Sequence, residues 1–153
     1  PNPIRALDDS LTPAQDAGRQ IYFTRTVDSP TCAGCHVLST TAGFFGTDGR
    51  ASFENEPQHF KIPHLRNLYQ KVGMFGYVGG GMGISGTGYL GDQVRGFGFL
   101  HDGSVPSLFD FLRIPLISFC NAIPCADELD HNARRRKTEA FLSSLGLLAI
   151  RRE

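Results

Sequence analysis

The pentapeptide Cys32-Ala33-Gly34-Cys35-His36 constrains this chain more than any other feature. Two thiols three positions apart can each form a thioether with one vinyl group of a haem. A His placed directly after the second thiol reaches the iron from the same side. We therefore predict one covalent haem c attached through Cys32 and Cys35, with His36 as the proximal ligand and the chain wrapped around it.

Two other uses of a Cys-x-x-Cys pair fit less well. A zinc site needs a second, similar pair, but Cys120 and Cys125 are separated by four residues rather than two. A thioredoxin-like redox pair belongs in a βαβ pattern, which this sequence does not show. Haem attachment is the interpretation that uses all three residues of the motif.

The sixth position of the iron decides between electron transfer and chemistry on a bound ligand. Met74 follows His36 by 38 residues and lies between Gly73 and Gly76 rather than in an apolar stripe, so we predict it as the second axial ligand. The alternatives left open are Met82, an open position, or one of three histidines: His59, His64 and His101.

Two long helices are predicted, one near each end of the chain. Residues 12–24 start with Thr12 as a cap before Pro13, and Gly18 lies beside their apolar stripe, where another helix can approach closely. The expected partner is a helix over residues 130–148. Its apolar side comprises Ala140, Phe141, Ser144, Leu145 and Leu148, and its polar side Asn132, Arg135 and Glu139.

Shorter elements are expected between these helices. Residues 63–72 and 105–113 each carry a proline near the start of an apolar pattern, the second with Ser104 as its cap. The stretch 73–103 holds 12 of the 18 glycines, which predicts a long loop. Because no alternating apolar and polar run is long enough for a sheet, the predicted class is all-α, a cytochrome c-like helical domain.

Length and charge set further limits. The 153 residues form one domain's worth of chain, and 15 basic side chains balance 15 acidic ones. We therefore expect a single domain over residues 1–153 that does not bind nucleic acid through a strong basic surface. No apolar run approaches the roughly 18 residues of a membrane-spanning helix. The start at Pro1 is expected of a processed protein or of a module from a larger one.

Several segments together resemble the haem domains of the bacterial dihaem cytochrome c peroxidase and MauG superfamily. The Pro-x-Leu-Arg-Asn element and the later His-Asp-Gly-Ser element are the most specific. The matching segments are Leu11-Thr12-Pro13, Gly18-Arg19-Gln20-Ile21-Tyr22-Phe23, the pentapeptide, Phe60-Lys61-Ile62-Pro63-His64-Leu65-Arg66-Asn67-Leu68 and His101-Asp102-Gly103-Ser104. The resemblance implies a helical haem domain, with Met74 where the chain returns towards the haem.

This sequence departs from that family in two respects. The peroxidases pair two haems, whereas a single Cys-x-x-Cys-His here rules out such a relay within this chain. The insertion 76–98 also separates the Leu-Arg-Asn and His-Asp-Gly-Ser elements, so no catalytic role is assigned to His101.

Two residues beside the motif are expected to hold the cofactor. Arg66 can pair with a haem propionate, and Asn67 can donate to the methionine sulfur or to a propionate, because their segment is expected to cross the haem face. An ordinary surface salt bridge is the alternative for Arg66.

The second cysteine pair predicts a different bond. Cys120 and Cys125 lack a following His, so we expect a local disulfide. Haem c is attached in oxidising compartments, where disulfides persist, and a periplasmic or otherwise exported location is therefore predicted. The basic run 134–137 is expected to be a solvated helix face or a docking surface for an acidic redox partner.

One-electron transfer is the function that these features favour, with a redox partner protein or a fused redox enzyme as the other half of the reaction. A peroxidase-like or oxygen-activating haem with an open sixth position is the catalytic alternative. A haem-based sensor module is the third.

Overall fold

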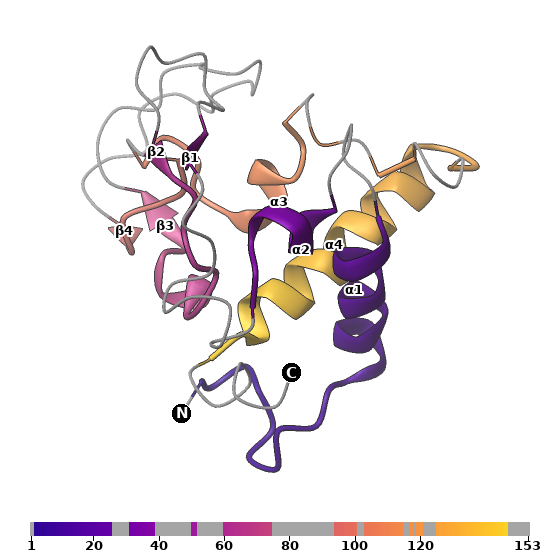
Figure 1. Cartoon of the computed structure of the whole chain (residues 1–153), viewed down its shortest axis with the longest axis horizontal. Helices are drawn as coiled ribbons and strands as arrows, with labels where there is room; N and C mark the ends of the chain where they lie inside the picture. The colour runs from indigo at the N-terminus through magenta and orange to yellow at the C-terminus, as the bar shows by residue number, and fades with distance from the viewer. Residues whose placement is uncertain are drawn as a thin grey trace.

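The computed structural model describes residues 2–25, 31–38, 50–51, 60–74, 94–100, 103–114, 117, 119–120 and 125–146 (Figure 1). At positions 50–51, 74 and 94–95 it describes the backbone alone. The regular structure in this part is mostly helical with little strand, which agrees with the predicted all-α class.

Helix α1 (Pro13–Thr24) begins where the sequence predicts. The Thr12 hydroxyl accepts from the Gln15 backbone N–H at 3.3 Å, and the Gln15 side chain accepts from the Thr12 N–H at 2.9 Å. This reciprocal pair satisfies two N–H groups that the helix cannot pair internally. The start of α1 is therefore encoded within four residues of sequence.

Helix α4 (Glu128–Ser144) lies beside α1, as predicted (Figure 1). A Cβ atom built on Gly18 would lie only 2.0 Å from the carbonyl oxygen of Lys137. Glycine thus allows the two backbones to touch, and Tyr22 packs on Phe141 with ring centroids 5.5 Å apart. The crossing of the two long helices is confirmed.

The bounds and one face of α4 differ from the prediction. The helix starts two residues earlier than residue 130, because the Asp127 side chain caps it by accepting from the Asp130 N–H at 2.9 Å. It ends at Ser144, and Leu148 lies outside the described residues. Arg135 was expected on the polar side but is only 6% exposed, because its guanidinium donates to the Leu112 carbonyl and pairs with Glu128.

The helix predicted over residues 63–72 is wrong except for one 3-10 turn, η2 (Leu68–Gln70). Asn67, just before it, has the left-handed φ of 57°, and its N–H donates to the Leu145 carbonyl at 2.8 Å. Both features interrupt an α-helical ladder. Tertiary hydrogen bonding to the end of α4 replaces the local helix.

The helix predicted over residues 105–113 is also shorter than expected, since α3 spans Leu108–Phe111. Val105 pairs with Phe99 in a β-bridge, and the Pro106 carbonyl accepts from the Gly73 N–H at 2.9 Å. Ser107 caps the helix in place of Ser104. The residues before Ser107 are extended because their backbone groups bond to Phe99 and Gly73 rather than within a local helix.

The described residues also form two short antiparallel ribbons. Strand β1 (Arg50–Ala51) pairs with β2 (Phe60–Lys61), with Arg50 opposite Lys61. Strand β3 (Gly73–Met74) pairs with β4 (Val94–Arg95), with Gly73 opposite Arg95. The second ribbon joins two points of the predicted glycine-rich loop, whose residues 75–93 and 101–102 lie outside the described part.

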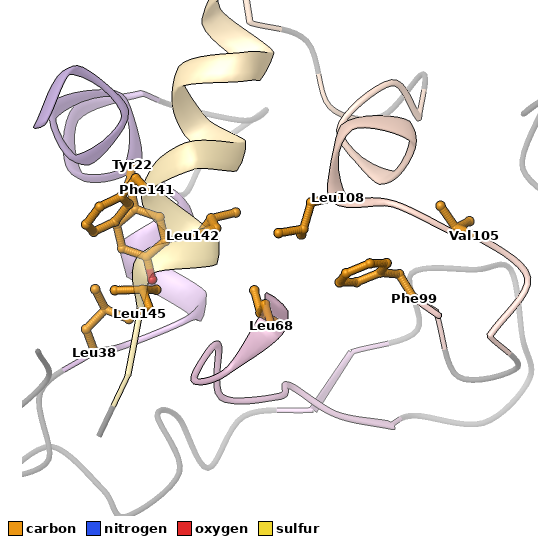
Figure 2. Packing of buried hydrophobic residues seen from close by; sticks show 9 residues of the cluster. All are labelled: Tyr22, Leu38, Leu68, Phe99, Val105, Leu108, Phe141, Leu142 and Leu145. Carbon is orange, nitrogen blue, oxygen red and sulfur yellow. The ribbon is translucent and has the colours of Figure 1, made fainter. Parts of the chain in front are cut away.

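The core extends from the α1–α4 contact across η2 to the segment around α3 (Figure 2). Its members are buried apolar side chains: Tyr22, Leu38, Leu68, Phe99, Val105, Leu108, Phe141, Leu142 and Leu145. Cys32 and Ala33 pack against this cluster from α2 (Cys32–Cys35). The pentapeptide is thus anchored on the core.

Within the described segments, none of the helices combines the length and the apolar character that crossing a membrane requires.

Candidate functional site

The two thiols of the pentapeptide lie one helical turn apart on α2. Thr31 caps this helix, its hydroxyl accepting from the Gly34 N–H at 3.1 Å, and the His36 N–H closes it on the Cys32 carbonyl at 2.8 Å. Cys32 and Cys35 are unbonded and partly exposed. Helical geometry puts both thiols near one edge of the turn, where two attachment points of one flat group can be reached.

The His36 ring is held through one of its two nitrogens. Its Nδ1 lies 2.9 Å from the Pro63 carbonyl oxygen, and the Tyr22 hydroxyl donates to the His36 carbonyl. Because a carbonyl can only accept, Nδ1 carries the proton and Nε2 keeps its lone pair. Burial lowers the pKa of His36, while the bond to Pro63 opposes that shift. The ring is therefore neutral at pH 7, as iron ligation requires.

These residues fit the haem that the motif implies. Two free thiols, one turn apart, precede an imidazole whose Nδ1 is held by a backbone carbonyl. A partner carbonyl on the other ring nitrogen orients a metal-bound His and raises its basicity. The donor set is that of the proximal side of haem c.

An open pocket of about 290 Å³ adjoins this site and is lined by Lys61, Ile62, Pro63 and His64. Pro63 belongs both to the pocket and to the His36 contact. Burial lowers the pKa of His64, and three cations lower it further: Arg66, Lys61 and Lys71. The rim of the pocket is therefore electropositive, which favours carboxylates.

Arg66 and Asn67 follow the pocket-lining residues along the chain. The Arg66 N–H donates to His64 Nδ1 at 3.3 Å, and Asn67 is tied to the Leu145 carbonyl through its own N–H. The segment is therefore fixed between the pocket and the end of α4. The expected contacts of Arg66 and Asn67 with propionates or a methionine sulfur stay predictions.

The structure describes only the backbone of Met74, the predicted sixth ligand of the iron. Met74 ends β3 opposite Val94, and its side chain is outside what the structure describes. Met82, His59 and His101 lie outside the described residues as well. His64, the remaining alternative, is exposed and accepts from Arg66 through Nδ1. The sixth ligand stays a prediction.

Sequence reasoning missed the buried residue Arg25. This side chain is 6% exposed and its guanidinium carbon is 4.4 Å from the centre of the Phe119 ring. Burial raises the pKa of the Cys32 thiol, and the charge and hydrogen bonding of Arg25 act in the opposite direction. Nothing in the sequence distinguishes Arg25, directly after α1, from an ordinary solvated arginine.

The basic run 134–137, predicted as a solvated helix face or a docking surface, is solvated in part: Arg136 and Lys137 are exposed, whereas Arg134 and Arg135 are largely covered. Arg134 pairs with Asp130 at 2.9 Å, and Arg135 with Glu128 at 2.7 Å. Arg136 pairs with Glu139 at 2.8 Å and stacks 3.6 Å from the centre of the Phe109 ring. Three of its four cations are used in contacts within the molecule.

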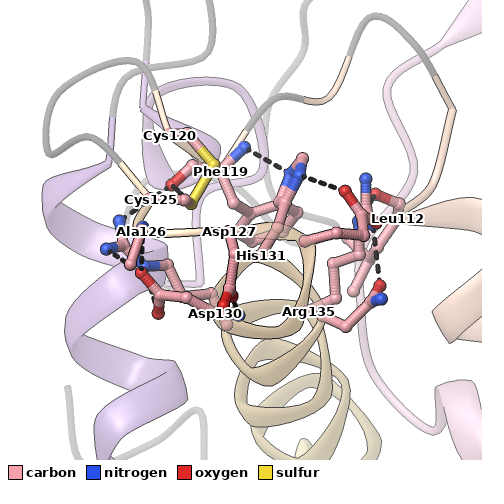
Figure 3. A network of polar contacts seen from close by, with 12 residues as sticks. Leu112, Phe119, Cys120, Cys125, Ala126, Asp127, Asp130, His131 and Arg135 are labelled. Atoms are coloured by element: carbon pink, nitrogen blue, oxygen red, sulfur yellow. Dashed lines mark hydrogen bonds and ion pairs between the residues drawn. A yellow bond between two sulfur atoms is a disulfide. The ribbon is translucent and has the colours of Figure 1, made fainter.

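The predicted disulfide between Cys120 and Cys125 is confirmed (Figure 3). Next to it, the Phe119 N–H donates to His131 Nε2 at 3.1 Å, and the Phe119 carbonyl accepts from Arg134 at 3.1 Å. His131 is largely covered, with 16% of its side chain exposed. The disulfide segment is thereby fastened to the first turns of α4.

Comparison of the chain with protein-family models, curated proteins and solved structures finds no match. The described residues hold no group of three or more His, Cys, Asp and Glu side chains that could bind a metal.

Proposed function

We propose that this protein is a one-electron carrier with a single haem c bound through Cys32 and Cys35 and ligated by His36. The observation that carries the proposal is the 2.9 Å contact between His36 Nδ1 and the Pro63 carbonyl. It joins the motif to a residue 27 positions away in the chain, and it leaves the second ring nitrogen available to iron.

The bound group would supply the exchange between ferric and ferrous iron. His36 provides a neutral nitrogen ligand, and the two thioethers tether the group to α2. Met74 is proposed on the opposite side, with Arg66 and Asn67 at the propionates. The core residue Phe99 is proposed as part of the apolar wall that excludes water.

The proposed redox partner and cellular location follow from the chemistry of a covalently bound haem. A carrier requires a redox partner protein or a fused redox enzyme. The confirmed disulfide supports a periplasmic or otherwise exported location, because disulfides persist in oxidising compartments.

Covalent attachment is tested by producing the chain in a bacterial periplasm with haem c maturation. We expect a mass gain of one haem and pigment that stays with the protein in acidified organic solvent. The double variant Cys32→Ala/Cys35→Ala should lose this pigment, and Cys120→Ser/Cys125→Ser, as the matched control, should keep it. Colourless wild-type protein, or extractable pigment, would contradict the proposal.

The electron-carrier role is tested by the ligand state of iron. We expect a low-spin ferric spectrum with the weak far-red sulfur-to-iron band, which Met74→Ala should abolish and Met82→Ala should preserve. A high-spin ferric form that binds carbon monoxide readily once reduced would favour the peroxidase-like alternative instead.

A further inference from the structure

Asn67 adopts a backbone conformation that few residue types tolerate. Its φ of 57° and ψ of 32° lie in the left-handed region. Residues with a Cβ atom, apart from Asn, Asp and His, seldom occur there, because the Cβ atom crowds the following carbonyl oxygen. In this conformation the Asn67 N–H donates to the Leu145 carbonyl at 2.8 Å, and the Asn67 carbonyl accepts from the Gln70 N–H at 3.0 Å, which starts η2.

The Leu145 carbonyl is a well-held acceptor for this bond. Leu145 directly follows α4 and is 2% exposed. The Asn2 side chain donates to the Ser143 carbonyl at 2.8 Å and to the Leu145 carbonyl at 3.4 Å. A Cβ atom built on Gly146 would lie 3.9 Å from Asn67 Oδ1, so the Asn67 side chain also lies beside the end of α4. Residue 67 is therefore docked on the end of the long helix.

The segment that contains Asn67 also carries the contact to His36. Pro63, four residues earlier, supplies the carbonyl oxygen 2.9 Å from His36 Nδ1. On the two sides of Asn67, Leu65 packs against the core cluster and Leu68 belongs to it. Because the chain direction at residue 67 depends on φ and ψ, leaving the left-handed region would pull one of these anchors away from its partner. The Pro63 carbonyl would then move relative to the His36 ring.

We infer that Asn67 is a positioning residue, whose left-handed backbone, docked on the Leu145 carbonyl, keeps the Pro63 carbonyl on His36. This inference rests on the proposed function and is separate from the propionate contact proposed for the Asn67 side chain. A carbonyl on the second ring nitrogen orients a metal-bound His and raises its basicity, so residue 67 acts on the ligand through this one bond. Glycine, which has no Cβ atom, can replace Asn67 in this role, whereas alanine cannot.

The test measures solvent exchange of the His36 Nδ1 proton by NMR on the reduced, low-spin, haem-loaded protein. Asn67→Gly and Asn67→Ala form a matched pair, because both remove the side-chain amide and only glycine tolerates the left-handed region. Asp9→Ala is the control. Asp9 is also left-handed, with a φ of 63°, but it belongs to the segment before α1. Absorption spectra verify that each variant carries covalent haem.

We expect the Nδ1 proton to exchange about tenfold faster in Asn67→Ala than in wild type, because alanine disfavours the left-handed conformation. Asn67→Gly and Asp9→Ala should stay within about twofold of wild type. Should Asn67→Ala yield no pigmented protein, pigment retained in Asn67→Gly would support the inference in the same way.

Three results would overturn the inference while the proposed function stands. They are unchanged exchange in Asn67→Ala, exchange or pigment loss in Asn67→Gly equal to that in Asn67→Ala, and an equal acceleration in Asp9→Ala. The second would show that the side-chain amide is what matters, and the third would show a general loss of stability. Wild-type protein without covalent haem would instead overturn the proposed function and this inference together.

Discussion

Three ionisable side chains, Arg25, Arg135 and His131, are covered in the folded chain. Arg25 stacks on the Phe119 ring, Arg135 donates to the Leu112 carbonyl at 3.3 Å, and His131 accepts from the Phe119 N–H. The backbone bonds of Arg135 and His131 offset part of the desolvation penalty that a covered polar group carries. At this scale, burial decides the chemistry of a residue more than its type does.

His131 makes stability depend on pH. Burial lowers its pKa below the ordinary 6.5, and Arg135 and Arg25 add to this shift while Glu128 opposes it. Below pH 6.5, His131 is protonated in the unfolded chain but stays neutral in the folded chain. The free energy of unfolding therefore decreases as the pH falls from about 7 towards the folded pKa. His36 in the haem-free chain and His64 contribute with the same sign.

Thermal unfolding of the haem-loaded protein at pH 7.5, 6.5 and 5.5 checks this expectation. The loss of melting temperature on acidification should be smaller in His131→Gln than in wild type. The exposed His64 provides the control, because His64→Gln should change the pH dependence of the melting temperature less than His131→Gln does. If acidification lowers the melting temperature equally in wild type and in His131→Gln, His131 does not have the lowered pKa that its burial implies.

At the scale of elements, helix pairing is the main determinant of the fold. The α1–α4 contact depends on Gly18, where a Cβ atom would meet the Lys137 carbonyl at 2.0 Å and Phe141 Cβ at 2.9 Å. The first of these contacts is with backbone, so only movement of a whole helix can relieve it. Phe141 and Tyr22 are almost completely buried, and both would lose packing contacts if the two helices moved apart.

Gly18→Ala should therefore destabilise the protein by about 1–3 kcal/mol, the range for overpacking, in spite of the better helix propensity of alanine. Chemical denaturation of the variant and wild type gives the difference in the free energy of unfolding. Ala14→Leu, at an exposed position of the same helix, should stay within about 0.5 kcal/mol. A Gly18→Ala variant as stable as wild type would contradict the close approach of the two helices.

How far the elements could be predicted depends on where their partners lie. Helix α1 and most of α4 follow from caps and apolar spacing, which act within a few residues. The segments after Pro63 and Val105 carry similar signals but make their hydrogen bonds to Leu145, Phe99 and Gly73. Local propensity is a weak preference, and these distant partners outweigh it.

On the scale of the whole molecule, the segment around Phe119 connects the end of α1 to the start of α4. The Phe119 ring covers Arg25, its backbone binds His131 and Arg134, and the disulfide follows directly (Figure 3). Because α1 also contacts α2, this connection continues to the helix of the attachment motif. The disulfide therefore supports the candidate site from a distance.

Cys120→Ser/Cys125→Ser should lower the free energy of unfolding by about 2 kcal/mol, the entropy expected for so short a closed loop. Urea unfolding followed by circular dichroism measures the loss. A thiol titration of the denatured, haem-loaded wild type should find no free thiol, since all four cysteines are then bonded. Two free thiols, or a double variant of unchanged stability, would contradict the role given to the disulfide.

The sequence by itself determined the features whose causes are local: the Cys-x-x-Cys-His spacing, the cap that starts α1, the small residue at the helix crossing and the choice of partner for Cys120. Tertiary structure decided that the Pro63 carbonyl binds His36, that Arg25 is buried against Phe119, and that the Arg134–Arg136 cations are used internally. The reason is physical. Caps and covalent spacing act between neighbours, whereas burial and long-range hydrogen bonds exist only after distant segments have packed together.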